Sequence, residues 1–197
     1  TRHALVSHAE PSCLGVVAEV CQSFVLDNGA FTHFRRGQPK VDWSDYYEWV
    51  APLLLLPSCD WAIIPDVIEG SAEDNDALLD QWPFQRWQGV PVYHLHEPTD
   101  RLVRLASEWP RVAIGSSGEY WQVGSDPWWS RMCEVMDAVT DDDGRPRCKL
   151  HGLRMLDWRV FTRLPLASAD SVNVGMNCGR TAKLLDVDPV AGAEVIA

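Results

Sequence analysis

Aspartate and histidine side chains follow several apolar runs of the chain, and these residue types serve in proton transfer and nucleophilic attack. Asp27, Asp66 and Asp170 each stand at or near the end of such a run, and His94 and His151 stand near the ends of two others. A lone aspartate in this position is usually a helix cap or a loop acceptor. Several of them on neighbouring parallel strands would instead converge on one edge of a sheet, where carboxylates can act as acid, base or nucleophile.

Two further segments are suited to ligand binding. Residues 92–96 (Val-Tyr-His-Leu-His) hold His94 and His96 two positions apart, so both imidazoles would lie on one face of a strand, as in metal-binding His-x-His pairs. A metal-dependent barrel hydrolase that uses these histidines, His151 and an aspartate is therefore one alternative. Gly115 opens a small-residue loop whose backbone amides could approach a ligand closely. No Walker lysine, dinucleotide fingerprint or serine-hydrolase motif accompanies it.

The elements that must position these residues alternate in type along the chain. We predict strands at residues 4–7, 24–27, 61–66, 90–96, 111–115, 149–153 and 169–174, and helices at residues 43–55, 72–81, 100–109, 127–139 and 157–164. Apolar strands alternating with helices are typical of an α/β protein with a parallel sheet, and seven or so strands with polar ends favour a compact (β/α)8 TIM-barrel-like fold. An open doubly wound sheet is the alternative, because 197 residues is short for a barrel.

Length and composition indicate a single folded domain over residues 1–197, with 46% hydrophobic and 23% charged residues. No apolar run is long enough to cross a membrane and no signal-peptide pattern opens the chain, so we expect a cytoplasmic protein. The six cysteines are scattered, which indicates reduced thiols. A net charge of −11 argues against nucleic-acid binding through a broad basic face, although a local basic path remains compatible with it.

In their order along the chain, these segments resemble the queuine and archaeosine tRNA-guanine transglycosylases. The similarity is to a shortened form, close to the 7-deazaguanine-inserting, DNA-modifying relatives in phages and bacteria, which would place a phage-encoded protein in the bacterial host cytoplasm. The segments that carry the resemblance are residues 26–31 (Leu-Asp-Asn-Gly-Ala-Phe, for Thr-Asp-Ser-Gly-Gly-Tyr/Phe), 114–119 (Ile-Gly-Ser-Ser-Gly-Glu, for the glycine-rich loop), 150–152 (Leu-His-Gly, for Leu-Met-Gly) and 169–172 (Ala-Asp-Ser-Val, for Phe-Asp-Cys/Ser-Val).

The resemblance, which spans about residues 23–174, implies base exchange through a covalent intermediate. Asp170 would be the nucleophile that attacks the glycosidic carbon, and Asp27 would manage protons on the leaving and entering bases. The sequence departs from the family at Thr32, where Gln is usual, and at residues 173–175, where Asn-Val-Gly replaces Pro-Thr-Arg. These departures keep a base or nucleoside glycosylase, which hydrolyses instead of exchanging, as an alternative.

Five residues would bind the flipped base by the same resemblance. Asp66 would accept hydrogen bonds from the donor edge of a 7-deazaguanine or guanine, His94 would replace a base-reading Gln, and Gly115 would offer backbone contacts. Phe31 and His151 would cover the two faces of the base.

A flipped base also needs its strand held beside the mouth of the site. The basic candidates for contacts with phosphates are Arg35, Arg36, Arg145, Arg147, Lys149, Arg180 and Lys183. The family's Cys-x-Cys-x-x-Cys zinc motif does not occur, so we expect no metal and no cofactor, and we favour DNA over tRNA as substrate. A homodimer or a protein partner stays open, as does a non-catalytic subunit that binds a base or nucleic acid.

Overall fold

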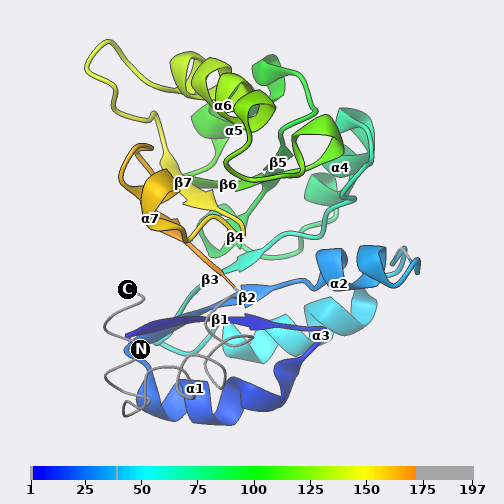
Figure 1. Ribbon diagram of the computed structural model, residues 1–197. Coiled ribbons are helices and arrows are strands. Elements are labelled where there is room, and N and C mark those ends of the chain that lie inside the picture. Colours follow the sequence, from blue (N-terminus) through cyan, green and yellow to red (C-terminus); the bar gives the residue numbers. More distant parts are fainter. Residues whose placement is uncertain (1, 39, 172–197) are drawn as a thin grey trace, which may run out of the picture.

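The computed structural model describes residues 2–38 and 40–171, which form an α/β protein (Figure 1). Its strands are β1 (His3–Ser7), β2 (Ser23–Asp27), β3 (Cys59–Ile63), β4 (Gly89–Val90), β5 (Val92–His94), β6 (Arg111–Gly115), β7 (Lys149–Gly152) and β8 (Ser168–Ala169). Its helices are α1 (Leu14–Val20), α2 (Ala30–Arg35), α3 (Ser44–Leu53), α4 (Ala72–Asp80), α5 (Thr99–Glu108), α6 (Asp126–Val139) and α7 (Trp158–Phe161), with 3-10 turns η1 (Pro11–Cys13), η2 (Arg86–Gln88) and η3 (Gly118–Tyr120). None of the described helices is long and apolar enough to cross a membrane.

The strands form two parallel four-stranded sheets, ordered β1-β2-β3-β4 and β5-β6-β7-β8. β4 and β5 are consecutive in sequence and separated by Pro91, which has no N–H to donate to a ladder. The Val90 carbonyl accepts a hydrogen bond from the Ile64 N–H, and the Pro91 carbonyl accepts one from the Ala113 N–H, both at 2.9 Å. The chain therefore passes directly from pairing with the first sheet to pairing with the second.

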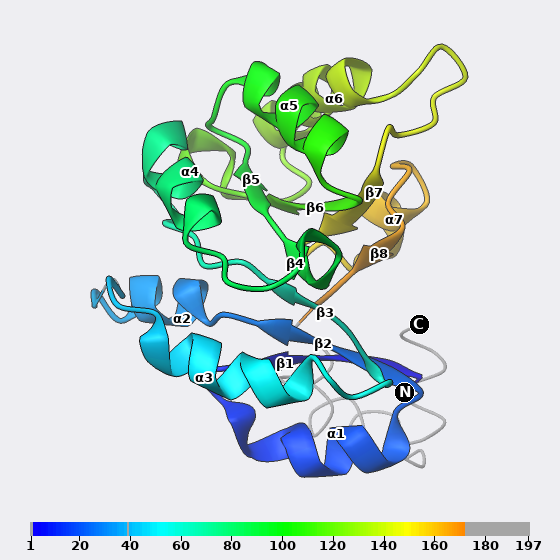
Figure 2. The ribbon, with the colours of Figure 1, turned by 180° about the vertical axis from the view of Figure 1, so that it is seen from behind.

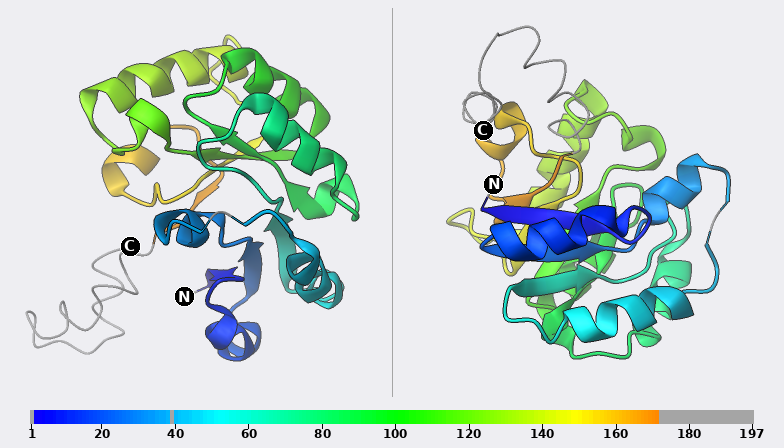
Figure 3. Two further views of the ribbon diagram at one scale, coloured as in Figure 1. Left: turned by 90° about the vertical axis from the view of Figure 1, so that its right-hand side faces the viewer. Right: turned by 90° about the horizontal axis from the view of Figure 1, so that it is seen from below.

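The helices lie outside the strands. Figure 2 shows α4, α5 and α6 together on one side of the molecule and α1 and α3 on the other, with the strands between them. The side view in Figure 3 shows the same arrangement. Because neighbouring parallel strands need a crossover connection, the helices return the chain to the amino ends of the strands, and the carboxyl ends gather on one edge. We call this edge the carboxyl edge.

The central strands β4, β5 and β6 are buried on both faces, and the two faces of the strands belong to different clusters. Side chains of alternate positions, such as Leu26 and Ile114, pack outward into the large core shared with the helices. The intervening positions form a smaller inner cluster. Its buried members are Trp61, Ile63, Val90, Val92 and Ala113. Strands buried on both faces read as continuous apolar runs, which is why the sequence signals them so clearly.

The structure confirms the parallel α/β class and all five predicted helices, with ends that differ by a few residues. The predicted strand at residues 111–115 agrees with β6 at both ends, whereas the predicted strand at residues 90–96 is divided by Pro91 and ends at His94. β8 is Ser168–Ala169, and residues 172–174 of its predicted extent lie outside the described residues. Among the described strands no hydrogen-bonded pairing closes β8 onto β1, so the finer prediction of a closed barrel is not established by the pairing.

Candidate functional site at the carboxyl edge

Asp27, the last residue of β2, carries a carboxyl group whose pKa is raised to about 6. Burial is the main cause, and the negative charges of Asp170 and Asp66 add to it, against a hydrogen bond from Ser7. The Ser7 hydroxyl donates to Asp27 Oδ2 at 2.8 Å and the Gly29 N–H donates to the same oxygen at 3.0 Å. A carboxyl group with this pKa exchanges protons near neutral pH, as a general acid or base must.

Gly29 shapes the turn that follows. Its φ of +80° lies in the left-handed region, and a Cβ there would lie 2.9 Å from the Cβ of Ala9. The turn therefore requires glycine for both conformation and space. It ends β2 and starts α2, which places Phe31 beside the carboxyl edge.

Asp66 lies three residues beyond β3 and is almost completely buried. The Asn28 side-chain amide donates to its Oδ1 at 2.8 Å, and the His94 imidazole Nε2–H donates to its Oδ2 at 2.9 Å. Asn28 also donates to the Ile64 carbonyl and accepts from the Ala30 N–H, so its own orientation is fixed. Each carboxylate oxygen retains a further lone pair, which lets Asp66 accept from a ligand while it is held on both sides.

His94 ends β5 and is likewise buried. With Nε2 bound to Asp66, its Nδ1 has no hydrogen-bond partner in the part of the chain that the structure describes. A Cβ at position 115 would lie 3.0 Å from this nitrogen, so Gly115 leaves the room that the imidazole occupies. The Gly115 carbonyl accepts the Leu95 N–H and retains a second lone pair, so the predicted backbone contact to a base stays a prediction.

The His94 and His96 side chains lie next to each other, and both ring nitrogens of His96 have protein partners. Their rings are stacked with centroids 5.8 Å apart, but His96 contacts the Ser117 hydroxyl through Nδ1 and the Gly70 carbonyl through Nε2. Over residues 2–38 and 40–171, no group of three His, Cys, Asp or Glu side chains could hold a metal ion. The metal-dependent hydrolase alternative therefore gains no ligand set from the described residues.

Asp170 lies directly after β8. Its Oδ1 accepts a hydrogen bond from the Arg154 N–H at 2.9 Å and lies 3.4 Å from His151 Nε2. His151 Nδ1 in turn contacts the Ser168 hydroxyl at 2.8 Å, and the ring meets Trp61 edge to face at a centroid distance of 5.0 Å. The structure thus places a buried His151 beside the carboxylate of Asp170, and its predicted contact with one face of the base stays a prediction.

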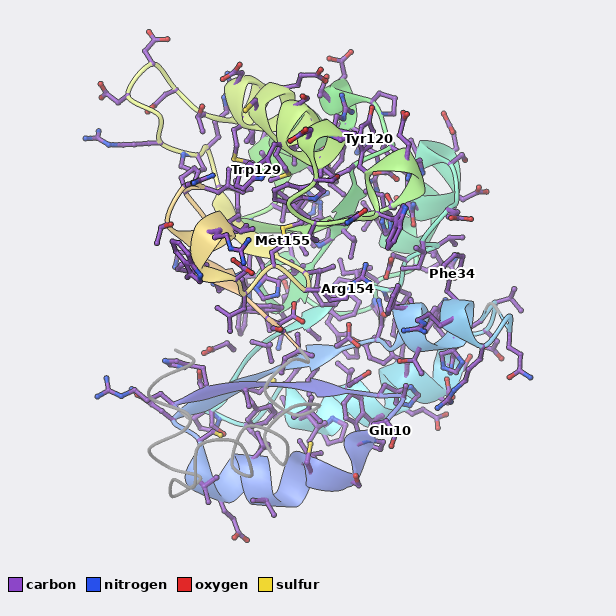
Figure 4. The ribbon with its side chains drawn as sticks, viewed as in Figure 1. Glu10, Phe34, Tyr120, Trp129, Arg154 and Met155 are labelled. Carbon is purple, nitrogen blue, oxygen red and sulfur yellow. The ribbon has the colours of Figure 1, made fainter. Side chains whose placement is uncertain are left out.

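Arg154 lies between the half of the molecule that holds β1 and β2 and the half that holds β5 and β6 (Figure 4). Its guanidinium carbon lies 3.6 Å from the centroid of the Phe31 ring, and its Nη2 donates to the Ser116 carbonyl at 3.2 Å. Burial lowers the pKa of Arg154, while the carboxylates of Asp170, Asp27 and Asp66 act in the opposite direction. Sequence reasoning missed this residue, although it is the first basic residue after a strand predicted to end at the site.

A pocket of about 320 Å³ opens beside Asp66. Its walls combine apolar and aromatic groups with Lys40 and Glu69 at the polar side. The apolar lining residues are Ala30, Phe34, Trp43, Val67 and Ile68. Asp66 itself lines the pocket, and Phe34 of its wall meets Phe31, with ring centroids 6.5 Å apart.

The basic candidates divide between two edges. Arg35 and Arg36 are exposed at the end of α2, after β2, and Arg36 lies 3.6 Å from Glu10. Lys149 is exposed at the first residue of β7, and so lies at the opposite, amino edge of the strands. Arg145 and Arg147 are exposed in the connection from α6 to β7, which leads to that amino edge. Arg180 and Lys183 lie outside the described residues.

The site therefore collects residues from most of the described chain. The predicted Asp27, Phe31, Asp66, His94 and Asp170 come together, and the sequence analysis missed four neighbours that hold or fill the site. These are Ser7, Asn28, Ser116 and Arg154. The five cysteines in the described ranges, Cys13, Cys21, Cys59, Cys133 and Cys148, are all free.

The fold and site define a parallel α/β protein with three aspartates, an aromatic ring and an arginine at its carboxyl edge. No protein-family model matches the chain, and neither a curated protein nor a solved structure matches it. The comparisons therefore support no family assignment.

Proposed function

We propose that this protein is a nucleic-acid guanine transglycosylase, which exchanges a guanine for a 7-deazaguanine through a covalent intermediate on Asp170. The observation that carries the proposal is the convergence of three aspartates with the Phe31 ring at one edge of parallel strands. Asp66 and Asp170 lie close enough to Asp27 for their negative charges to raise its pKa, in addition to the larger effect of burial. The preferred substrate is DNA, with tRNA as the other nucleic acid to test.

The first half-reaction breaks the glycosidic bond. A carboxylate oxygen of Asp170 bonds to C1′ of the sugar, and the electron pair of the C1′–N9 bond passes to the departing guanine. The protonated carboxyl group of Asp27 supplies the proton that neutralises the leaving base. Its pKa of about 6 leaves part of the population protonated near neutral pH.

The second half-reaction reverses these roles. The Asp27 carboxylate takes the N9 proton of the entering 7-deazaguanine, N9 bonds to C1′, and the bond from Asp170 to C1′ breaks to restore the carboxylate. Atoms and protons balance without a cofactor. Water in place of the entering base would give hydrolysis, so the glycosylase alternative shares the first half-reaction.

Base recognition falls to Asp66 and Phe31. The buried Asp66 carboxylate would accept hydrogen bonds from the N1–H and exocyclic N–H of guanine, a donor edge that adenine lacks. His94 would act as a positioning residue, because its imidazole and the Asn28 amide fix both oxygens of Asp66. Phe31 would stack on the base.

The barrel form of the fold belongs to the same proposal. Within each sheet the strands lie in the order of the sequence, as in a (β/α) barrel. Trp61 of β3, in the first sheet, contacts His151 of β7, in the second. We infer that the two sheets curve around the inner cluster as one barrel-like unit, with the site at the mouth built from strand carboxyl ends.

A covalent-adduct experiment tests the proposal. Wild type and Asp170→Asn are mixed with single-stranded and duplex DNA or tRNA oligonucleotides, with and without 7-deazaguanine, and examined by denaturing electrophoresis and intact mass. We expect an adduct in the wild type, its discharge with incorporation of the added base, and a loss of at least about 10³-fold in Asp170→Asn. An undiminished adduct in the variant would refute the nucleophile, and discharge without incorporation would favour the glycosylase.

A further inference from the structure

Arg154, which lies near the three aspartates, has an uncommon backbone conformation. It has a φ of +59°, and no other described non-glycine residue has a positive φ. Such a conformation is costly for a residue with a side chain and persists where the surroundings enforce it. Here the backbone N–H is held by Asp170 Oδ1, and the side chain is held by Phe31 and the Ser116 carbonyl.

The guanidinium makes contacts that a guanine-type base would also make. It is planar, lies on the face of Phe31 at 3.6 Å, and donates an N–H to a backbone carbonyl. The amidine edge of guanine, N1–H with the exocyclic amine, presents the same planar N–C–N unit with outward N–H groups. Both groups are attracted by nearby carboxylates, and the charges of Asp170, Asp27 and Asp66 all act on Arg154.

Within residues 2–38 and 40–171, the Arg154 guanidinium has no carboxylate ion-pair partner. The contact of Arg154 with Asp170 is made by the backbone N–H. Arg101 and Arg104 by contrast each pair directly with Asp76. A guanidinium that is stacked and bound to one carbonyl can be displaced without leaving a broken ion pair behind.

We propose that the Arg154 side chain occupies the position over Phe31 that the substrate base takes, here called the seat. The side chain must withdraw when a base binds, and the seat selects planar ligands with an amidine N–H edge. This inference rests on the proposed function, because it identifies the residue that controls access to that same site. Arg154 is thus a gate on base binding, and its stacking on Phe31 competes with that of the base.

The experiment measures binding of the free base without any nucleic acid. Wild type, Arg154→Ala, Arg154→Gly and the control Arg159→Ala are titrated with 7-deazaguanine and with adenine by calorimetry. Arg159 belongs to the same segment and lies near the Trp158 ring at 5.9 Å, but its side chain is exposed. Glycine at position 154 keeps the left-handed backbone available, so it separates loss of the side chain from loss of the turn.

We expect the Arg154 variants to bind 7-deazaguanine at least tenfold more tightly than wild type, with Arg159→Ala unchanged and adenine weak throughout. Methylguanidine should bind the two Arg154 variants and compete there with the base, because it refills the vacated seat. Thermal melting of each variant confirms folding.

Two outcomes would overturn the inference in different ways. Equal or weaker base binding by folded Arg154 variants, with clear binding by wild type, would remove the gate and leave the proposed transglycosylase intact. If none of the four folded proteins bound a base, the proposed base site itself would fall, and the gate with it.

Discussion

Two charged clusters, each at least partly buried, differ in how their charges are matched. The first is the aspartate cluster of the carboxyl edge, Asp27, Asp66 and Asp170. The second is the Glu97 cluster, in which Glu97 Oε2 accepts from Arg101 at 2.7 Å and Oε1 accepts from Asn75 at 2.9 Å. In the Glu97 cluster an arginine pairs with the carboxylate and balances its charge. In the aspartate cluster no described arginine or lysine forms an ion pair with a carboxylate, and the negative charges of Asp66 and Asp170 act on Asp27.

His94 connects the two clusters, and each end of this residue serves a different purpose. Its backbone N–H donates to Glu97 Oε2 and its imidazole donates to Asp66, both at 2.9 Å. The Glu97 cluster thus fixes the backbone of His94, and the His94 side chain in turn orients Asp66 of the aspartate cluster. Matched charges stabilise a fold, whereas adjacent negative charges raise the pKa of a carboxyl group toward the range that proton transfer needs.

The largest effect on stability should come from breaking the Glu97 cluster. Arg101→Met keeps the length of the side chain but leaves Glu97 buried and unpaired, and we expect a loss of about 3–5 kcal/mol in the free energy of unfolding. Urea denaturation measures it. The matched control is Arg104→Met, which removes the other partner of Asp76 from a partly exposed position and should cost less than about 1 kcal/mol. Equal losses in both variants would contradict the distinction between a buried and a partly exposed pair.

Much of the fold could be predicted because the signals were local. The run at residues 111–115 is apolar, β-branched and ended by glycine, and β6 has those bounds. Ser71 and Asp74 form the capping box that starts α4, and Ser125 caps α6 ahead of a proline in its first turn. The convergence of polar residues on the carboxyl edge could be predicted from topology alone, because parallel strands place their carboxyl ends on the same edge of a sheet.

The rest depended on tertiary context. α1 was missed because none of its residues is buried and Val16 and Val20 are exposed, so it has no clear apolar stripe. α2 begins at Ala30, directly after the left-handed Gly29, where a tight turn was the more obvious interpretation. The two contacts that shape the site, Asn28 to Asp66 and Arg154 to Ser116, each join residues 38 positions apart. No periodicity in one sequence encodes such pairs.

In the aspartate cluster a substitution should raise the free energy of unfolding, whereas Arg101→Met in the Glu97 cluster lowers it. The folded-state pKa of Asp27, about 6, lies above the ordinary value of 3.8, so folding favours its protonated form. As pH rises from about 4 to about 6, the unfolded chain releases its proton first and the folded state loses stability. Asp27→Asn removes this cost, and we expect it to stabilise the protein by up to about 3 kcal/mol above pH 6 relative to wild type, with little difference below pH 4.

Chemical denaturation of wild type and Asp27→Asn across pH 3.5–8 measures that difference directly. A pH-independent gap between the two proteins would mean that the Asp27 carboxyl is not perturbed by folding. The same variant should also slow adduct formation, because asparagine cannot deliver the proton to the leaving base. If Asp27→Asn gained stability and lost activity, the aspartate cluster would serve the reaction at a cost in stability, unlike the Glu97 cluster.

The smallest expected effect compares the two edges of the strands through their exposed cations. Arg35 follows β2 at the carboxyl edge and its charge acts on Arg154, whereas Lys149 begins β7 at the amino edge. If the nucleic acid lies across the carboxyl edge, Arg35→Ala should weaken oligonucleotide binding a few-fold and reduce the salt dependence by about one phosphate contact, and Lys149→Ala should change neither. Fluorescence anisotropy at several salt concentrations measures both quantities. The reverse result would move the nucleic-acid path to the amino edge, away from Asp170, and a base could then not reach the aspartate cluster from a bound strand.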